Sequence, residues 1–287
     1  MNYNTRILTA ACIDSVFEFS KGVEFEVILV DNASTDGSRE FFEKDSRITY
    51  IYLQENCGFG RANNAGLERA SGKYIFLLNS DTYLLNDALK LFFDKMEESG
   101  ENVACLGTLL KDKDGNTIHS YGRFLSAAPL YKELLFGKPY DRYDPAEWRK
   151  GNFFRADYAT GADLFIRRSV ISKYGLFDAD FFMYYEDAEL QSRYARHGCF
   201  SYIYDAPQIV HLFSQSDDRR KAPTAAGRLI AAAKRRSRRI RSERLFFKKT
   251  KSRSEYLLIY LPFTLLERVV LFITDLASRL RNAFVKK

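Results

Sequence analysis

The chain has 287 residues, of which 46% are hydrophobic and 28% charged, and its formal net charge is +7. This composition excludes a disordered chain and is typical of one large or two small globular domains. The four cysteines have no CxxC spacing, which excludes the common zinc and haem motifs and favours a reduced compartment. Residues 1–18 lack the apolar run of a signal peptide, so we expect a cytoplasmic protein.

The first two hundred residues alternate short apolar runs with helical periodicity, which predicts an α/β sheet protein. The predicted strands span residues 25–30, 48–53, 74–78, 103–107, 163–167 and 200–204. The predicted helices span residues 8–19, 37–44, 60–70, 86–98 and 186–197. We also expect a hairpin at 109–121, around Asp114 and Gly115. The stretch at 125–155 contains three prolines, and we expect a loop region with short helices there.

The positive charge is concentrated near the C-terminus. Residues 219–253 contain 15 Lys and Arg against one acidic residue, which leaves the rest of the chain net negative at −7. A polar linker at 214–224 precedes this segment, and apolar residues at 255–284 follow it. We expect a first helical arm over 255–261, ended by Pro262, and then an amphipathic helix from Thr264. The longest uncharged run, 256–266, is too short to span a bilayer.

The first polar motif follows the strand predicted at 25–30. Asp31 and Asn32 come at its carboxyl end, where ligands bind in open α/β sheets. Such side chains can hydrogen-bond to a base or a ribose. A helix cap at Ser34 or Thr35 explains the same residues without any ligand.

A second motif, Asn79-Ser80-Asp81, follows the strand at 74–78. One carboxylate together with nucleotide diphosphate oxygens can hold Mg²⁺ or Mn²⁺. A third motif places Glu186 and Asp187 at the start of a helix, where one of them could act as a general base. Alone, the second motif is also compatible with a turn, and the third with acids that interact favourably with the helix dipole.

The three motifs together, in this order, resemble a family 2 glycosyltransferase with the nucleotide-sugar-binding GT-A fold, most closely its rhamnosyltransferase-like branch. The resemblance extends over about residues 2–214. The matching stretches are residues 2–4, 30–38, 56–59, 63–66, 72–74, 78–81, 161–162 and 186–187, together with His211.

The resemblance implies a role for each matching residue. Asp187 is the catalytic base, with Glu186 beside it, and Asp81 is the metal ligand, to which His211 is added. Gly161 and Ala162 lie on the acceptor side of the pocket. The nucleotide-sugar-binding residues implied are Tyr3, Asp31, Asn32, Asn56, Gly58, Asn64, Asn79 and Ser80.

The implied fold is a Rossmann-like mixed sheet flanked by helices over residues 1–217, followed by a basic linker or helix over 218–253 and amphipathic helices over 254–287. The family's first strand, which lies beside the strand at 25–30, has no counterpart here. We therefore expect either a start codon upstream of Met1 or a truncated product.

The implied reaction is an inverting transfer, supported by Mg²⁺ or Mn²⁺, from a nucleotide-sugar to a cell-surface polysaccharide or lipid-linked glycan. The first expectation for the donor is dTDP-L-rhamnose, and the second is a UDP-sugar. A polybasic segment next to an amphipathic helix also predicts binding to an anionic membrane surface through residues 228–284, on the cytoplasmic side of the plasma membrane.

Three alternatives remain at this stage. The C-terminal helix could dock on the enzyme body instead of a membrane. The chain could be an inactive, truncated glycosyltransferase that serves as a membrane-bound scaffold. A nucleic-acid-binding protein is the least favoured, because the sequence has no recognised nucleic-acid-binding motif, so nucleic acid is not an expected partner.

Overall fold

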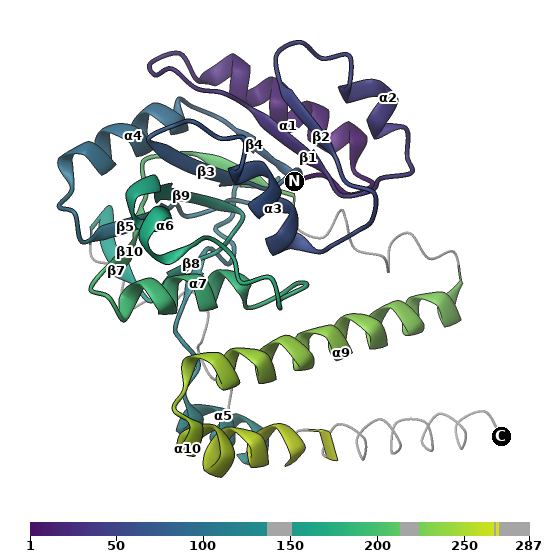
Figure 1. Ribbon diagram of the computed structural model, residues 1–287, viewed down its shortest axis with the longest axis vertical. Helices are drawn as coiled ribbons and strands as arrows, with labels where there is room; N and C mark the ends of the chain where they lie inside the picture. Colours follow the sequence, from purple (N-terminus) through teal and green to yellow (C-terminus); the bar gives the residue numbers. More distant parts are fainter. Residues whose placement is uncertain (137–150, 213–223, 267, 270–287) are drawn as a thin grey trace.

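The computed structural model describes residues 1–136, 151–212, 224–266 and 268–269 (Figure 1). The predicted linker at 214–223 and most of the predicted amphipathic helix, from residue 270 on, lie outside the described residues.

A mixed five-stranded sheet forms the centre of the molecule. Its strands are, in spatial order, β3 (Tyr74–Leu78), β9 (Asp163–Arg167), β5 (Val103–Gly107), β10 (Phe200–Tyr204) and β7 (Phe153–Ala156). Only the β5–β10 pair is parallel, and the other neighbours are antiparallel. The predictions at 74–78, 103–107, 163–167 and 200–204 are confirmed, whereas β7 lies in the region that was predicted to be irregular.

Alternation along β9 divides the core into two layers, because successive side chains of a strand point to opposite faces. Phe165 packs with Phe92 of helix α4 (Ala88–Glu98) on one face. Leu164 and Ile166 pack with Leu190 of α7 (Glu186–Ala195) on the other. The sheet is therefore covered by helices on both faces, as the mixed α/β architecture requires.

Smaller elements complete this body. The remaining helices are α1 (Arg6–Phe19), α2 (Ser38–Phe42), α3 (Phe59–Leu67), α5 (Ala127–Phe136) and α6 (Arg168–Tyr174). The short strands are β4 (Thr82–Leu84), β6 (Tyr121–Gly122), β8 (Tyr158–Ala159) and β11 (Ile209–His211). The hairpin predicted at 109–121 is present as a short antiparallel turn, closed by the Lys111 to Thr117 bridge and by backbone hydrogen bonds from Asp112 to Asn116 and from Ile118 to Leu110. Helix α5 is one of the short helices expected within 125–155.

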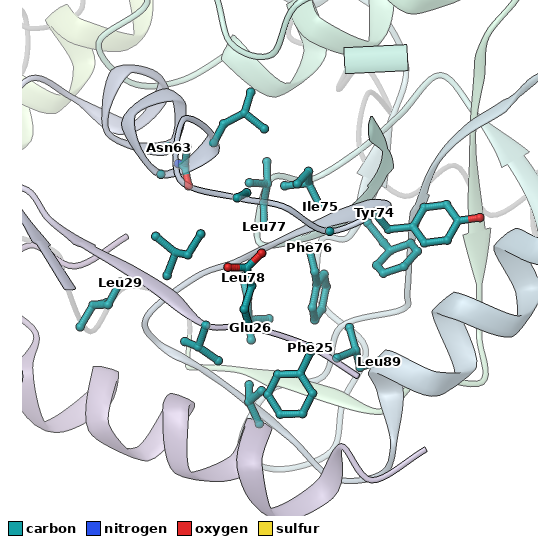
Figure 2. A pocket seen from close by; sticks show the side chains of 18 of the residues that line it. Phe25, Glu26, Leu29, Asn63, Tyr74, Ile75, Phe76, Leu77, Leu78 and Leu89 are labelled. Carbon is teal, nitrogen blue, oxygen red and sulfur yellow. The ribbon is translucent and has the colours of Figure 1, made fainter. Parts of the chain in front are cut away.

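The N-terminal strands form a separate, parallel two-stranded sheet of β1 (Ile28–Asp31) and β2 (Thr49–Tyr52). On its other edge β1 pairs with Asn2, whose backbone amide donates to the Val30 carbonyl at 2.8 Å. A cavity of about 320 Å³ separates β1 from β3. Figure 2 shows its apolar walls, with Leu29 on the β1 side and Leu77 on the β3 side.

The C-terminal residues form a helical layer against the body. The long helix α9 (Ala225–Thr250) is followed by α10 (Arg253–Glu255) and the π-helix η2 (Tyr256–Tyr260), with α5 close to α10 in Figure 1. Phe246 and Phe247 of α9 are buried in a cluster with Tyr260 and Phe263. The basic segment is thus a helix that is docked through aromatic side chains.

The prediction that Pro262 ends a helical arm is wrong, since helical structure continues from 261 to 266. The π-turn before it changes the hydrogen-bond register, and the Leu261 amide donates to the Tyr256 carbonyl. The wider hydrogen-bond spacing of the π-turn accommodates Pro262, which has no N–H to donate. Among the described residues, no helix is both long enough and apolar enough to cross a membrane.

Candidate functional site

Two elements from distant parts of the sequence bring Asp81 and His211 together. Asp81 lies in the turn between β3 and β4, and His211 ends β11, which pairs antiparallel with β4. The distance from His211 Nε2 to Asp81 Oδ1 is 3.1 Å, and both residues are only 7% exposed. The Leu212 amide also donates to the Asp81 carbonyl at 2.8 Å, which fixes the two strand ends against each other.

This pair fits a divalent cation with hard oxygen ligands. Such a cation is commonly held by one or two carboxylates together with substrate phosphates, and an imidazole can complete the protein's share. Among the described residues, no group of three or more His, Cys, Asp or Glu side chains could enclose a metal. Asp81 and His211 would thus form an open site whose remaining ligands come from a diphosphate or from water.

The first polar motif is connected to the second by a buried chain of hydrogen bonds. The side-chain amide of Asn2 donates to Asp31 Oδ2 at 3.2 Å, and its oxygen accepts from the Thr5 hydroxyl at 2.8 Å. The Thr5 hydroxyl lies 3.1 Å from that of Ser80. Asp31 also accepts from the Ser34 amide at 2.7 Å and the Tyr50 hydroxyl at 3.0 Å. The ends of β1 and β3 are therefore held in one rigid arrangement beside Asp81.

Asn32 organises the loop that precedes α3. Its amide nitrogen donates to Asn56 Oδ1 at 2.9 Å, and its oxygen accepts from the Cys57 amide at 2.9 Å. Gly58 has φ +87°, and a Cβ at this position would lie 2.3 Å from the carbonyl oxygen of Phe182. Only glycine allows this approach, which brings the nucleotide-side loop against the segment that leads to Glu186.

The remaining predicted residues take different positions. Tyr3 is 40% exposed, next to the junction of Asn2 with β1. Asn64 exchanges two hydrogen bonds with the backbone of Phe177, at 2.8 and 3.1 Å, so its amide joins α3 to that loop. The Asn79 amide donates to the Ala162 carbonyl at 2.9 Å, which connects the metal-side turn to the predicted acceptor side.

Asp187 lies at the start of α7 and faces the same region. Its Oδ2 accepts from the Gly161 amide at 3.1 Å, and its Oδ1 accepts from the Ala188 amide at 2.8 Å. The two residues before Glu186, Tyr184 and Tyr185, have φ values of +76° and +65°. Left-handed backbone costs about 1–3 kcal/mol per bulky residue and clusters at functional sites. Tyr184 and Tyr185 thus form a sharp turn that places Glu186 and Asp187 at the start of α7.

The adjacent carboxyl groups differ in their partners. Burial raises the pKa of both, and the charge of Asp187 raises the pKa of Glu186 further. Backbone N–H groups oppose this effect at Asp187, whereas Glu186 Oε2 has no hydrogen-bond partner among the described residues. Glu186 therefore holds a proton more tightly than Asp187, and Asp187 is the member of the pair that ionises first.

Two residues of this neighbourhood were not predicted. The pKa of His119 is lowered to about 4, mainly by burial and in smaller part by Arg239 and His211, while Asp187 opposes the shift. His119, Asp187, His211 and Arg239 thus form one electrostatic neighbourhood. A lone histidine in an apparently irregular stretch gave no sequence signal. Arg239 lies within the basic run, for which the sequence predicted only binding to an anionic membrane surface.

A third buried carboxyl group lies behind the site. Asp163 is fully buried at the start of β9, opposite Leu78, and its Oδ2 accepts from the Thr108 amide at 2.6 Å. Burial raises its pKa to about 8. The group is neutral at physiological pH and does not add a charge to the site.

Comparisons with known proteins agree with this geometry. The family model for glycosyl transferase family 2 matches residues 2–174. The putative teichuronic acid biosynthesis glycosyltransferase TuaG of Bacillus subtilis is 34% identical over 42% of this chain and 49% of its own length. The N-acetylglucosaminyl-diphospho-decaprenol L-rhamnosyltransferase of Mycobacterium tuberculosis is 25% identical over 67% of this chain and 68% of its own. The first curated relatives are matched over less than half of their length.

Solved structures show the same fold at low identity. A mannosyltransferase from Pyrobaculum calidifontis, in complex with GDP-Man and Mn²⁺, has a TM-score of 0.55 at 16% identity, covering 99% of this chain and 77% of its own. The Staphylococcus aureus TarS fragment 1–349 has a TM-score of 0.52 at 16% identity, over 73% and 58%. The mixed sheet, the helices on both faces and the match over residues 2–174 lead to one conclusion: the chain is a member of glycosyl transferase family 2 with a GT-A fold.

Proposed function

We propose that this protein is an inverting glycosyltransferase that moves a sugar from a nucleotide diphosphate donor to a glycan acceptor. The observation that carries the proposal is that three contacts lie next to one another. His211 contacts Asp81, the backbone amide of Asn79 donates to the Ala162 carbonyl, and the backbone amide of Gly161 donates to Asp187. A cation site, an acceptor wall and a base thus occupy one edge of the sheet.

Asp187 is the proposed base. It takes the proton as the acceptor hydroxyl oxygen bonds to the anomeric carbon, and the bond from that carbon to the diphosphate breaks with its electrons going to the leaving group. Because Glu186 is neutral, Asp187 carries the only negative charge of the two carboxyl groups. Asp81 and His211 are the proposed ligands of a divalent cation, which would neutralise charge on the leaving diphosphate. The family neighbours crystallised with Mn²⁺ support this role.

The donor we propose first is dTDP-L-rhamnose, and the alternative is a UDP-sugar. The name of the mycobacterial relative supports both a rhamnosyl donor and a lipid-linked acceptor. The teichuronic acid relative supports a cell-surface polysaccharide as the product. The proposed binding residues are those around Asp31, Asn32 and Ser80, which the hydrogen-bond chain through Asn2 holds beside Asp81.

We further propose that the protein works at the cytoplasmic face of the plasma membrane. Three consecutive apolar residues of η2, Leu257, Leu258 and Ile259, are 46%, 77% and 36% exposed beside the basic helix α9. An apolar surface next to cationic side chains favours binding to anionic lipid headgroups.

An inactive scaffold is the second candidate, and the cavity between β1 and β3 favours it, because an incompletely filled sheet lies directly behind the donor site. One experiment separates the two functions. The protein is incubated with Mn²⁺, each of dTDP-rhamnose, UDP-N-acetylglucosamine and GDP-mannose, and a glycolipid extract, and nucleoside diphosphate release is measured. Release that requires both acceptor and metal supports the enzyme. Donor binding without any release supports the scaffold.

A further inference from the structure

A second cavity, of about 840 Å³, lies between α9, the segment 180–183 and η2. We call it the α9 pocket. Four cationic side chains of α9 line it: Arg238, Arg241, Arg244 and Lys248. Their spacing of three or four residues brings them to one side of the helix. None of the residues assigned to the donor site lines this cavity.

The charge of the α9 pocket is almost entirely positive. Its one lining carboxylate, Asp180, is bound by Lys249 Nζ at 2.6 Å. Two of the cations are oriented by aromatic residues: Arg238 lies over the Phe182 ring at 5.4 Å, and Arg244 Nε donates to the Tyr256 hydroxyl at 3.0 Å. Guanidinium groups held in this way suit the multiple oxygens of a phosphate or diphosphate.

The opposite side of the pocket is apolar. Leu257 and Leu261 line it, and the exposed Leu258 continues the same surface outward. This surface includes a π-helix, a rare structure that is frequently found at functional sites. A ligand that matches both sides carries its negative charge next to a hydrocarbon chain.

The α9 pocket is attached directly to the catalytic segment. The Ser242 hydroxyl donates to the Met183 carbonyl at 2.8 Å, and the Tyr185 hydroxyl donates to Glu243 at 2.7 Å. Met183, which lines the pocket, precedes Asp187 by four residues, so their backbones are within roughly 15 Å of each other. This distance corresponds to a few sugar units.

We propose that the α9 pocket binds the diphosphate group of an isoprenoid-linked glycan acceptor. The cationic side chains of α9 contact the diphosphate, the hydrocarbon chain leaves over Leu257 and Leu258, and the attached sugar points toward Asp187. This inference rests on the proposed function, of which it specifies the acceptor class.

The test measures binding of farnesyl diphosphate, a short isoprenoid diphosphate, to the full chain by equilibrium dialysis. The pocket variant is Arg241→Gln/Lys248→Gln. The matched control is Lys234→Gln/Arg236→Gln, which removes the same charge from exposed positions of α9 outside the pocket. We expect the pocket variant to bind at least about tenfold more weakly, since each lost contact is a charge-assisted hydrogen bond. The control should stay within twofold of the unmodified protein.

Four results would overturn the proposal: no binding of farnesyl diphosphate, equal losses in both variants, equally tight binding of inorganic diphosphate, or equal displacement by phosphatidylglycerol vesicles. Equal losses would indicate a diffuse basic surface, and displacement by vesicles would indicate a site for bilayer lipid. Binding of UDP and dTDP with Mn²⁺ is measured on the same samples. If the unmodified protein binds neither UDP nor dTDP, the proposed function is contradicted. If it binds one of them, a failure to bind farnesyl diphosphate concerns the α9 pocket alone.

Discussion

The sheet edge around Asp187 and the helix α9 both contain charged residues, but those of the sheet edge are buried and many of those on α9 are exposed. At the sheet edge, Glu186 and Asp81 are 7% exposed, and Asp81 is held against His211. On α9, Lys234, Arg236 and Arg238 are exposed. The helix is docked by its buried aromatic residues, so these cations are not needed to hold it in place.

This difference determines how each region responds to change. A buried charge acts through a low effective dielectric and is screened little by salt, so one substitution has a large effect. Exposed charges act additively, each contributes little, and salt weakens all of them. Four experiments address this contrast, the last of them at the cation site.

The largest effect is expected at Asp187. Replacing the proposed base by Asn should lower turnover by roughly 10²–10⁴-fold, because proton removal from the acceptor is lost, while donor binding changes little. Glu186→Gln is the matched control. Its carboxyl group already holds the shared proton, so an uncharged amide should preserve most of the activity. Rates of nucleoside diphosphate release check both variants. Equal losses would show that the proton has been assigned to the wrong residue.

A second effect concerns stability and Asp163. In the unfolded chain this carboxyl group titrates near 3.8, but in the folded protein its pKa is about 8. Folding therefore takes up a proton between these values, and the contribution of Asp163 to stability falls as pH rises from about 4 to 8. Asp163→Asn, which retains an acceptor for the Thr108 amide, should gain stability relative to the unmodified protein over this range.

Urea unfolding at pH 5 and pH 8 measures this difference in the free energy of unfolding. Asp114→Asn is the control, because it makes the same change of side chain at an exposed position. If the two variants follow the same pH dependence, Asp163 is not a buried neutral acid.

The smallest effects are expected on the exposed face of α9. Lys234→Gln and Arg236→Gln should each weaken binding to phosphatidylglycerol vesicles by about 1 kcal/mol at low salt, and their effects should add. Both effects should largely disappear at high ionic strength, which vesicle sedimentation with and without added salt would show. A loss that persists in salt would indicate a specific site at these residues instead of a diffuse surface.

Much of this arrangement could be predicted from sequence where local pattern and tertiary environment agree. The strands at 74–78, 103–107, 163–167 and 200–204 are short apolar runs that the sheet buries on both faces. The grouping of Asp81, Asp187 and Gly161 was implied by the resemblance to family 2 glycosyltransferases and not by local pattern.

The errors arise where tertiary contacts decide. Short helices were expected within 125–155, but the position of α5 depends on the packing of Leu130 and Tyr131 against the C-terminal layer, which local patterns could not reveal. The docking of α9 depends on Phe246 and Phe247, two apolar residues within a basic run. His119 lacks any motif, and only folding brings it near Asp187.

The most direct test of the proposed glycosyltransferase is calorimetric binding of a panel of nucleotide-sugars to the unmodified protein and to Asp81→Asn, each with Mn²⁺ and with EDTA. We predict that at least one nucleotide-sugar binds the unmodified protein with Mn²⁺, and that EDTA or the substitution weakens this binding at least about tenfold. Binding that is equally tight with EDTA and in the variant would contradict the assignment of Asp81 to a cation site. No binding of any donor would contradict the proposed activity.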